Sequence, residues 1–185
     1  MISERTLVTV VAFLALGANL GEPVRQIQRA LHALEERAVR VRRQARWYRS
    51  APVGPPGQPD YVNTAAEIET ELKPLELLDA AKAVEGKLGR NFGTERWGPR
   101  LIDIDIALYD DREISLPQLT IPHAQLTRRR FVLAPLADLV PELRPPGLPP
   151  IRTLLAALDD DPGDLQVFDP LSASPESDTR HTSGS

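Results

Sequence analysis

The chain has 185 residues, of which 42% are hydrophobic and 26% charged, a composition typical of a globular protein with one hydrophobic core. Its formal net charge of −4 gives no overall positive field for nucleic acid or anionic lipid, so any anion site must be local. The absence of cysteine excludes disulfides, thiolate metal sites and a cysteine nucleophile, and it fits a cytoplasmic protein.

The predicted elements begin with a buried strand. Residues 7–16 are apolar and rich in Val and Thr, and residues 17–21 are predicted to form a turn. A secretory hydrophobic segment is the alternative, but the stretch is too short to span a bilayer, and no membrane association is predicted. Residues 23–36 then predict an amphipathic helix that starts at Pro23.

The middle of the chain alternates strands and helices. Residues 38–48 predict a strand with one basic face, residues 50–60 a Pro- and Gly-rich loop, and residues 61–72 a further strand. A second helix begins at Pro74, and its predicted apolar stripe consists of Leu75, Leu78, Ala81 and Leu88. Residues 90–100 form an arginine-rich loop and residues 101–109 the next strand.

Shorter elements are predicted to follow: a strand at 114–116, a helix in the second half of 127–139 and a helix at 151–158. The order β-α-β-β-α-β predicts an α+β fold, a ferredoxin-like sandwich in which helices pack on one face of an antiparallel sheet. We expect residues 1–158 to form one domain. Residues 159–185 are rich in Asp, Ser, Thr and Pro and predict a disordered tail.

The strand at 101–109 carries the most informative pattern. Side chains alternate between faces of a strand, so Asp103 and Asp105 point one way while Ile102, Ile104 and Ile106 point toward a core. Neighbouring carboxylates repel unless a cation or a proton compensates them. Carboxylates that bind a divalent cation beside arginines are typical of phosphoryl transfer, whereas a solvated acidic face is the simpler alternative. The chain contains neither GxxxxGK[ST] nor GxGxxG, so a bound nucleotide would depend on these residues.

The chain also contains the motifs LGANLG at 16–21, YRSAPVG at 48–54, QPDYVN at 58–63, RWGPRLIDIDI at 96–106 and IPH at 121–123. Together these motifs resemble the 6-hydroxymethyl-7,8-dihydropterin pyrophosphokinase family of the folate pathway. Glu85 and Arg90, and Arg129 and Phe131, fall in the family's order and spacing. The resemblance covers roughly residues 10–143 and implies a ferredoxin-like fold.

The resemblance implies pyrophosphoryl transfer from ATP to the hydroxymethyl group of the pterin, which yields AMP. Asp103 and Asp105 would hold two Mg²⁺ ions, and Arg90, Arg96 and Arg100 would face the triphosphate, with Arg90, Arg100 and both aspartates as the catalytic group. The nucleotide side would also include Glu85, Trp97, Ile106, Thr120, His123 and Arg129. The pterin would stack between Tyr61 and Phe131 and hydrogen-bond Asn63, Ser50 and Val53.

Four positions depart from the family pattern: Ala51, Gly93, Gln118 and Ala124. They bear on nucleotide contacts and loop closure rather than on the metal or pterin residues. Two other functions stay open from the residues alone. One is a two-metal phospho- or nucleotidyltransferase with another acceptor, and the other is a ferredoxin-like RNA-binding module that uses the basic strand. The expected partners are small molecules, with no nucleic acid, and we expect a monomer.

Overall fold

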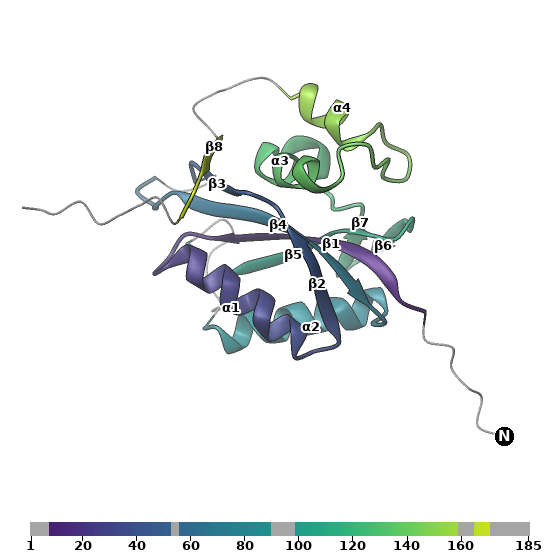
Figure 1. Ribbon diagram of the computed structural model, residues 1–185, viewed down its shortest axis with the longest axis horizontal. Coiled ribbons are helices and arrows are strands. Elements are labelled where there is room, and N and C mark those ends of the chain that lie inside the picture. The colour runs from purple at the N-terminus through teal and green to yellow at the C-terminus, as the bar shows by residue number, and fades with distance from the viewer. Residues whose placement is uncertain (1–7, 53–55, 90–98, 159–164, 171–185) are drawn as a thin grey trace, which may run out of the picture.

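The computed structural model describes residues 8–52, 56–89, 99–158 and 165–170. A six-stranded antiparallel sheet lies between two helical layers (Figure 1). In chain order its elements are β1 (Val10–Ala18), α1 (Pro23–Glu35), β2 (Val39–Gln44), β3 (Trp47–Ser50), β4 (Tyr61–Thr70), α2 (Pro74–Lys87) and β5 (Asp103–Tyr109). The hairpin β6 (Ile114–Leu116) and β7 (Leu119–Ile121) follows, then η1 (Leu126–Arg128), α3 (Arg130–Leu139), α4 (Ile151–Ala156) and β8 (Leu165–Phe168).

The strand order β5-β1-β4-β3-β8, with β2 also paired to β4, confirms the predicted α+β ferredoxin-like fold. The helices differ from the prediction, because they cover both faces of the sheet rather than one. In Figure 1, α1 and α2 lie below the sheet, and α3 and α4 lie above it. This second layer matters for function, since α3 covers the sheet face that carries Asp103 and Asp105.

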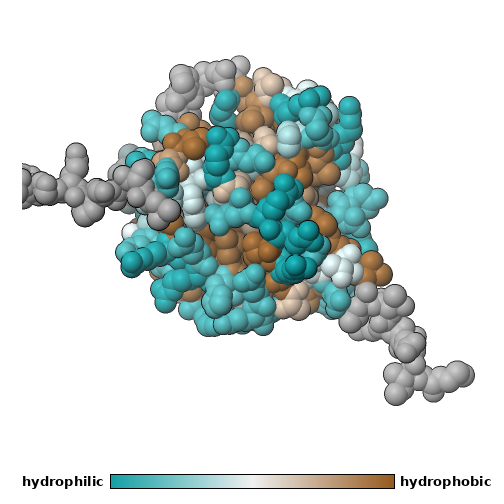
Figure 2. All heavy atoms as spheres, viewed as in Figure 1, coloured by the Kyte–Doolittle hydropathy of each residue, from teal (hydrophilic) through white to brown (hydrophobic). Residues whose placement is uncertain are grey.

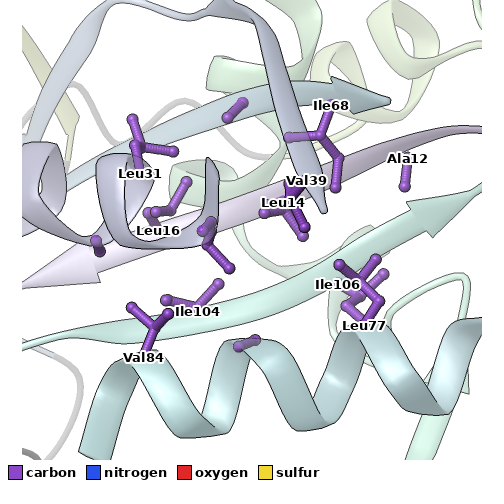
Figure 3. Close-up of a cluster of buried hydrophobic side chains, with 14 of the residues drawn as sticks. Ala12, Leu14, Leu16, Leu31, Val39, Ile68, Leu77, Val84, Ile104 and Ile106 are labelled. Carbon is purple, nitrogen blue, oxygen red and sulfur yellow. The ribbon is translucent and has the colours of Figure 1, made fainter. Parts of the chain in front are cut away.

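Two hydrophobic clusters correspond to the two faces. The first joins β1, β4 and β5 to α1 and α2, and it buries Ile102, Ile104 and Ile106 as predicted. Figure 3 shows Ile104 of β5 and Val84 of α2 pointing toward one another in this layer. The second cluster packs Phe13, Ala65 and Leu108 against α3 and α4.

Some boundaries differ from the prediction. The predicted strand at 38–48 is divided into β2 and β3, and Ala45 N–H between them donates to the Ala65 carbonyl at 2.9 Å. The first strand runs through Gly17 to Ala18, so the turn begins later than predicted. The buried stripe of α2 consists of Leu77, Ala80, Ala81, Val84 and Glu85, and the predicted position Leu75 is exposed instead.

The C-terminal region also needs a correction. Residues 159–185 are predicted to be disordered, but Leu165–Phe168 forms β8 and pairs with β3, Ser50 opposite Leu165 and Trp47 opposite Phe168. Arg49 lies 5.0 Å from the centre of the Phe168 ring. The prediction fails for these residues because the partner strand is distant in sequence, so local composition carries no signal of the pairing.

A polar contact fixes α3 to the sheet. Asp138 on α3 accepts hydrogen bonds from the Arg46 guanidinium at 3.1 Å and from the Tyr48 hydroxyl at 2.9 Å. Burial and the hydrogen bond to Asp138 raise the pKa of Tyr48 to about 12, and the same carboxylate raises the pKa of Arg46 above its usual range. Since Arg130 begins the same helix, this contact also sets where the start of α3 lies over the sheet.

The outer surface in the view of Figure 2 is mainly hydrophilic along its lower edge, over α1 and α2. This agrees with the amphipathic pattern of α1, whose buried residues include Ile27, Leu31 and Leu34. Within the described part of the chain, no helix combines the length and hydrophobicity that a membrane span requires.

Candidate active site

A cavity of about 260 Å³ lies between the open face of the sheet and the start of α3. This size is close to the lower end of small-molecule sites, about 300–1,000 Å³. Its walls are formed by Ala15, Leu16, Gly17, Ser50, Ala51, Tyr61, Asn63, Lys82, Arg100, Asp103, Asp105, Arg129, Phe131 and Val132. Residues from several elements and from the segment before β5 therefore meet in one place.

The register of three neighbouring strands builds this cavity. Gly17 on β1 pairs with Asn63 on β4 and with Asp103 on β5, and two residues earlier Ala15 pairs with Asp105. Directly paired residues in an antiparallel sheet point to the same face. Asn63 and Asp103 therefore stand on one face with β1 between them, two strand spacings or about 10 Å apart.

Small residues on β1 keep the floor of the cavity low. A Cβ atom added to Gly17 would lie 3.1 Å from the Asn63 side-chain oxygen and 3.8 Å from the Tyr61 ring. Ala15 leaves similar space beside Asp105. The sequence motif at 16–21 suggested a turn, but at Gly17 the chain needs glycine to leave room above a strand.

The β4 side of the cavity combines an aromatic ring with a fixed amide. Asn63 is buried, and its amide nitrogen donates to the Ser50 hydroxyl oxygen at 2.9 Å. This hydrogen bond fixes the amide orientation, so one edge of Asn63 faces the cavity in a defined manner. Tyr61 comes from the same strand face, and Phe131 approaches from the start of α3.

The β5 side is charged. Asp103 accepts a hydrogen bond from the Arg100 guanidinium at 2.7 Å, and Asp105 lies 3.7 Å from Nε2 of His123. Both carboxylates are partly exposed, Asp103 by 25% and Asp105 by 39% of the side chain. Arg129 also lines the cavity, and its guanidinium lies 5.4 Å from the centre of the Phe131 ring.

Asn19, which the sequence analysis quoted only as part of a motif, joins the two sides. Its side chain is buried, its amide nitrogen donates to the Pro59 carbonyl at 3.2 Å, and its amide oxygen accepts from Arg100 N–H at 2.7 Å. Its own backbone N–H donates to the Arg100 carbonyl at 3.0 Å. One residue thus ties the loop before β4 to the segment that leads into β5.

Glu85 is not at the surface of the cavity. Its side chain has no exposed area, its carboxylate accepts from Ile104 N–H at 2.7 Å, and it pairs with the Lys82 ammonium at 3.1 Å. Glu85 is therefore enclosed between α2 and β5 rather than exposed on the outer face of the helix. The amide that Glu85 holds lies between the two aspartates in sequence.

Other candidates lie away from the cavity walls. The Ile106 side chain is buried in the first cluster, and Thr120 is exposed on β7. His123 follows the cis peptide bond between Ile121 and Pro122, and its side chain lies beside Asp105. The backbone N–H of His123 donates to the Ala107 carbonyl at 3.0 Å. Of the departures from the family pattern, Ala51 lines the cavity. Gln118 and Ala124 are exposed elsewhere.

Four predicted site residues lie outside the described residues: Val53, Arg90, Arg96 and Trp97, as does Gly93. Among the residues that the structure does describe, no three acidic, histidine or cysteine side chains gather as a self-sufficient metal site. Mg²⁺ needs no such cluster, because it keeps water ligands and takes one or two carboxylates together with substrate phosphates. Asp103 and Asp105 on one strand face fit that requirement.

Residues 13–141 match the family described as 7,8-dihydro-6-hydroxymethylpterin-pyrophosphokinase (HPPK). The chain belongs to this family. It is 47% identical over 149 residues to a 2-amino-4-hydroxy-6-hydroxymethyldihydropteridine pyrophosphokinase of Pseudomonas aeruginosa. The matched region covers 78% of this chain and 90% of that relative. The enzyme of the same name from Haemophilus influenzae is 41% identical over 152 residues, 82% of this chain and 94% of the relative.

Solved structures agree on the fold. The wild-type HPPK-DHPS of Plasmodium falciparum, crystallised with pteroate, superposes with a TM-score of 0.66 at 18% identity. The match covers 80% of this chain but only 42% of that longer protein. The HPPK match over residues 13–141 includes every cavity residue named above, whereas α4 and β8 lie beyond it.

Proposed function

We propose that this protein transfers a pyrophosphoryl group from ATP to the hydroxymethyl group of 6-hydroxymethyl-7,8-dihydropterin in folate biosynthesis, giving AMP and the pterin pyrophosphate. Family membership and the identity to named pyrophosphokinases support this proposal. The observation that carries it is the alignment of Asn63, Gly17 and Asp103 across three strands. In this alignment Asn63 and Asp103 lie about 10 Å apart, on either side of Gly17, which has no side chain.

The pterin half would bind a flat ring by stacking and by its polar edge. Tyr61 and Phe131 line the cavity from opposite layers, and an aromatic stack contributes about 0.5–1.5 kcal/mol per pair beyond area burial. Asn63 offers a donor and an acceptor to the amide-like edge of the ring. Ser50 holds Asn63 in position, and Val53, outside the described residues, would contribute a backbone contact.

The nucleotide half would bind the triphosphate through arginines. Arg100 and Arg129 lie at the cavity, and the guanidinium group suits phosphate oxygens because its planar donors match them. We assign Arg90, Arg96 and Trp97 to the same side, with His123, Thr120 and the backbone of Ile106 near the adenosine end. Glu85 acts through the groups it holds, Ile104 N–H and Lys82.

Asp103 and Asp105 would hold Mg²⁺, and we propose two ions. When bound, these ions supply positive charge to the attacking and leaving oxygens of the transfer. The chain's own contribution is to keep both carboxylates on one face of a strand whose other face is buried in the core. We further propose that the protein is cytoplasmic, where ATP and Mg²⁺ are both plentiful, and that it is a monomer.

The direct test is to incubate the purified chain with ATP, Mg²⁺ and the hydroxymethyl pterin and to separate the nucleotide products. AMP in a 1:1 ratio with pterin pyrophosphate is the expected result. ADP as the main product would mean transfer of a single phosphoryl group and would refute the proposal. An assay in which Mg²⁺ is removed with a chelator should stop turnover, which would return when Mg²⁺ is added.

A further inference from the structure

A lysine faces the cavity beside the two aspartates. Lys82 lies on α2, its side chain is 38% exposed, and it forms part of the cavity wall with Arg100, Asp103 and Asp105. Nothing in the sequence motifs singled it out. A cation at this place needs an explanation, because α2 otherwise contributes buried residues to the first cluster.

The position of the ammonium is set from below by a buried carboxylate. Both oxygens of Glu85 accept from Lys82, at 3.1 and 3.2 Å, and Glu85 has no exposed area. The same carboxylate accepts from Ile104 N–H at 2.7 Å. A buried charge that is held by an ammonium and a backbone amide is costly to move, so the nitrogen of Lys82 stays near the start of β5.

Glu85 itself is enclosed, so it is an unsuitable direct contact for a bound nucleotide, whereas Lys82 offers donors to the cavity. An ammonium has three N–H donors, and its partner beneath it is a single carboxylate. A pterin ring is neutral and would contact the aromatic ring of Tyr61 and the amide of Asn63 on β4. The triphosphate is negatively charged, so it is the part of the substrates that would accept a charge-assisted hydrogen bond from a lysine beside Asp103 and Asp105.

We propose that Lys82 is a nucleotide-phosphate-binding residue and that Glu85 is the positioning residue that holds it. This inference rests on the proposed function and deepens it. It assigns the group on α2 that meets the nucleotide to position 82 rather than to position 85. Lys82 then supplies a fixed positive charge in addition to that of Arg100 and Arg129.

The test compares two proteins that differ only at position 82. Replacing Lys82 alone would leave the buried Glu85 carboxylate without its ammonium, which could unfold the chain. In Glu85→Gln the side-chain oxygen still accepts from Ile104 N–H. Lys82→Met/Glu85→Gln removes both charges on that same background. Lys87→Met is the matched control, because Lys87 lies on the same helix and pairs with Glu36 at 3.2 Å away from the cavity.

Binding of a non-hydrolysable ATP analogue with Mg²⁺ is measured by titration calorimetry. The double variant should bind it about 10- to 100-fold more weakly than the wild type, the range for loss of a charge-assisted hydrogen bond. Glu85→Gln should lie between the two, because its lysine keeps its charge but loses the carboxylate that positions it. Pterin affinity should match that of Glu85→Gln, and AMP should lose less affinity than the triphosphate analogue. Lys82→Arg should retain analogue binding, and Lys87→Met should equal the wild type.

Affinity of the double variant for the analogue equal to that of the wild type would overturn the inference. An equal loss for pterin would also overturn it, because the lysine would then serve the site as a whole. The binding assay gives a result whether or not turnover occurs. Failure of AMP production by the wild type, in contrast, refutes the proposed function itself.

Discussion

The core side and the cavity side of β5 and of Ile102, the residue just before it, should respond to substitution in opposite ways. Asp105→Asn changes a side chain that is 39% exposed on the cavity side, whereas Ile102→Val shortens a side chain with no exposed area in the first cluster. Both changes remove little volume. Any difference between them therefore reports the face to which each residue points.

The magnitudes follow from burial and charge. Ile102→Val should cost about 0.5–1.5 kcal/mol, because it removes one buried methylene group. At about 2–4 °C per kcal/mol for a chain of this size, its melting temperature should fall by roughly 1–6 °C. Asp105→Asn weakens the partly exposed contact with His123, worth less than about 1 kcal/mol, and relieves repulsion with Asp103. The ligand-free variant should be as stable as the wild type or slightly more stable.

Activity should show the reverse order. Asp105→Asn should lower kcat/KM by about 10²–10³-fold or more, because a group that stabilises transition-state charge is lost. Ile102→Val should stay within a few-fold of the wild type. Thermal unfolding followed by circular dichroism, and AMP formation at saturating Mg²⁺, measure the two effects. If Asp105→Asn keeps near-wild-type turnover, or if it unfolds while Ile102→Val does not, the assignment of the two faces is wrong.

Three further changes test other parts of the site. Burial and the hydrogen bond to Asp138 raise the pKa of Tyr48 from 10 to about 12. As the pH rises, the unfolded chain therefore loses this proton before the folded chain does. The contribution of Tyr48 to the free energy of unfolding should be fully present below pH 10 and should be lost from pH 10 to 12. Denaturant titrations of Tyr48→Phe should lack that component of the fall, and an unchanged pH profile would contradict it. Gly17→Ala puts a Cβ 3.1 Å from the Asn63 oxygen. The KM for the pterin should therefore rise about tenfold, as expected for one disturbed hydrogen bond, while the KM for ATP changes little. Equal changes in both KM values would count against the proposed pterin half. Asn19→Ala removes the hydrogen bonds from the buried Asn19 side chain to the Pro59 carbonyl and from Arg100 N–H, and it should lower the free energy of unfolding by about 1–3 kcal/mol in chemical denaturation, together with a lower kcat. A fully active and stable variant would show that the two loops need no such link.

Local patterns predicted the elements that carry the acidic pair. Alternation of Ile and Asp placed the carboxylates on one face and the isoleucines in the core, and helical spacing predicted α1 with Ile27, Leu31 and Leu34 buried. These predictions succeed because burial of one face is decided within a few residues. The stripe on α2 was predicted in part: Ala81 is buried and Leu78 and Leu88 pack against the first cluster, but Leu75 is exposed. Leu, Ala and Val occur around most of that helix, so spacing alone did not fix which side meets the sheet.

Contacts between distant parts of the chain could not be predicted in this way. Glu85 is charged yet completely buried, and its partners include a lysine three residues before it and an amide 19 residues after it. The pairing of β8 with β3 likewise depends on a partner more than a hundred residues away. The second helical layer was missed for the same reason, since the contact of Asp138 with Arg46 exists only after both segments have folded.

The position of β5 at the edge of the sheet explains how the site tolerates its charge. An edge strand pairs on one side only, and here β1 occupies that side with the small residues Ala15 and Gly17. The other side would leave an amide such as that of Ile104 without a strand partner, and Glu85 satisfies it. Two carboxylates can therefore project into open space over a strand whose backbone is fixed on both sides. The cations that accompany a bound nucleotide would relieve the repulsion between these two carboxylates. The same two charges should therefore lower the stability of the ligand-free protein and strengthen the binding of nucleotide with its cations.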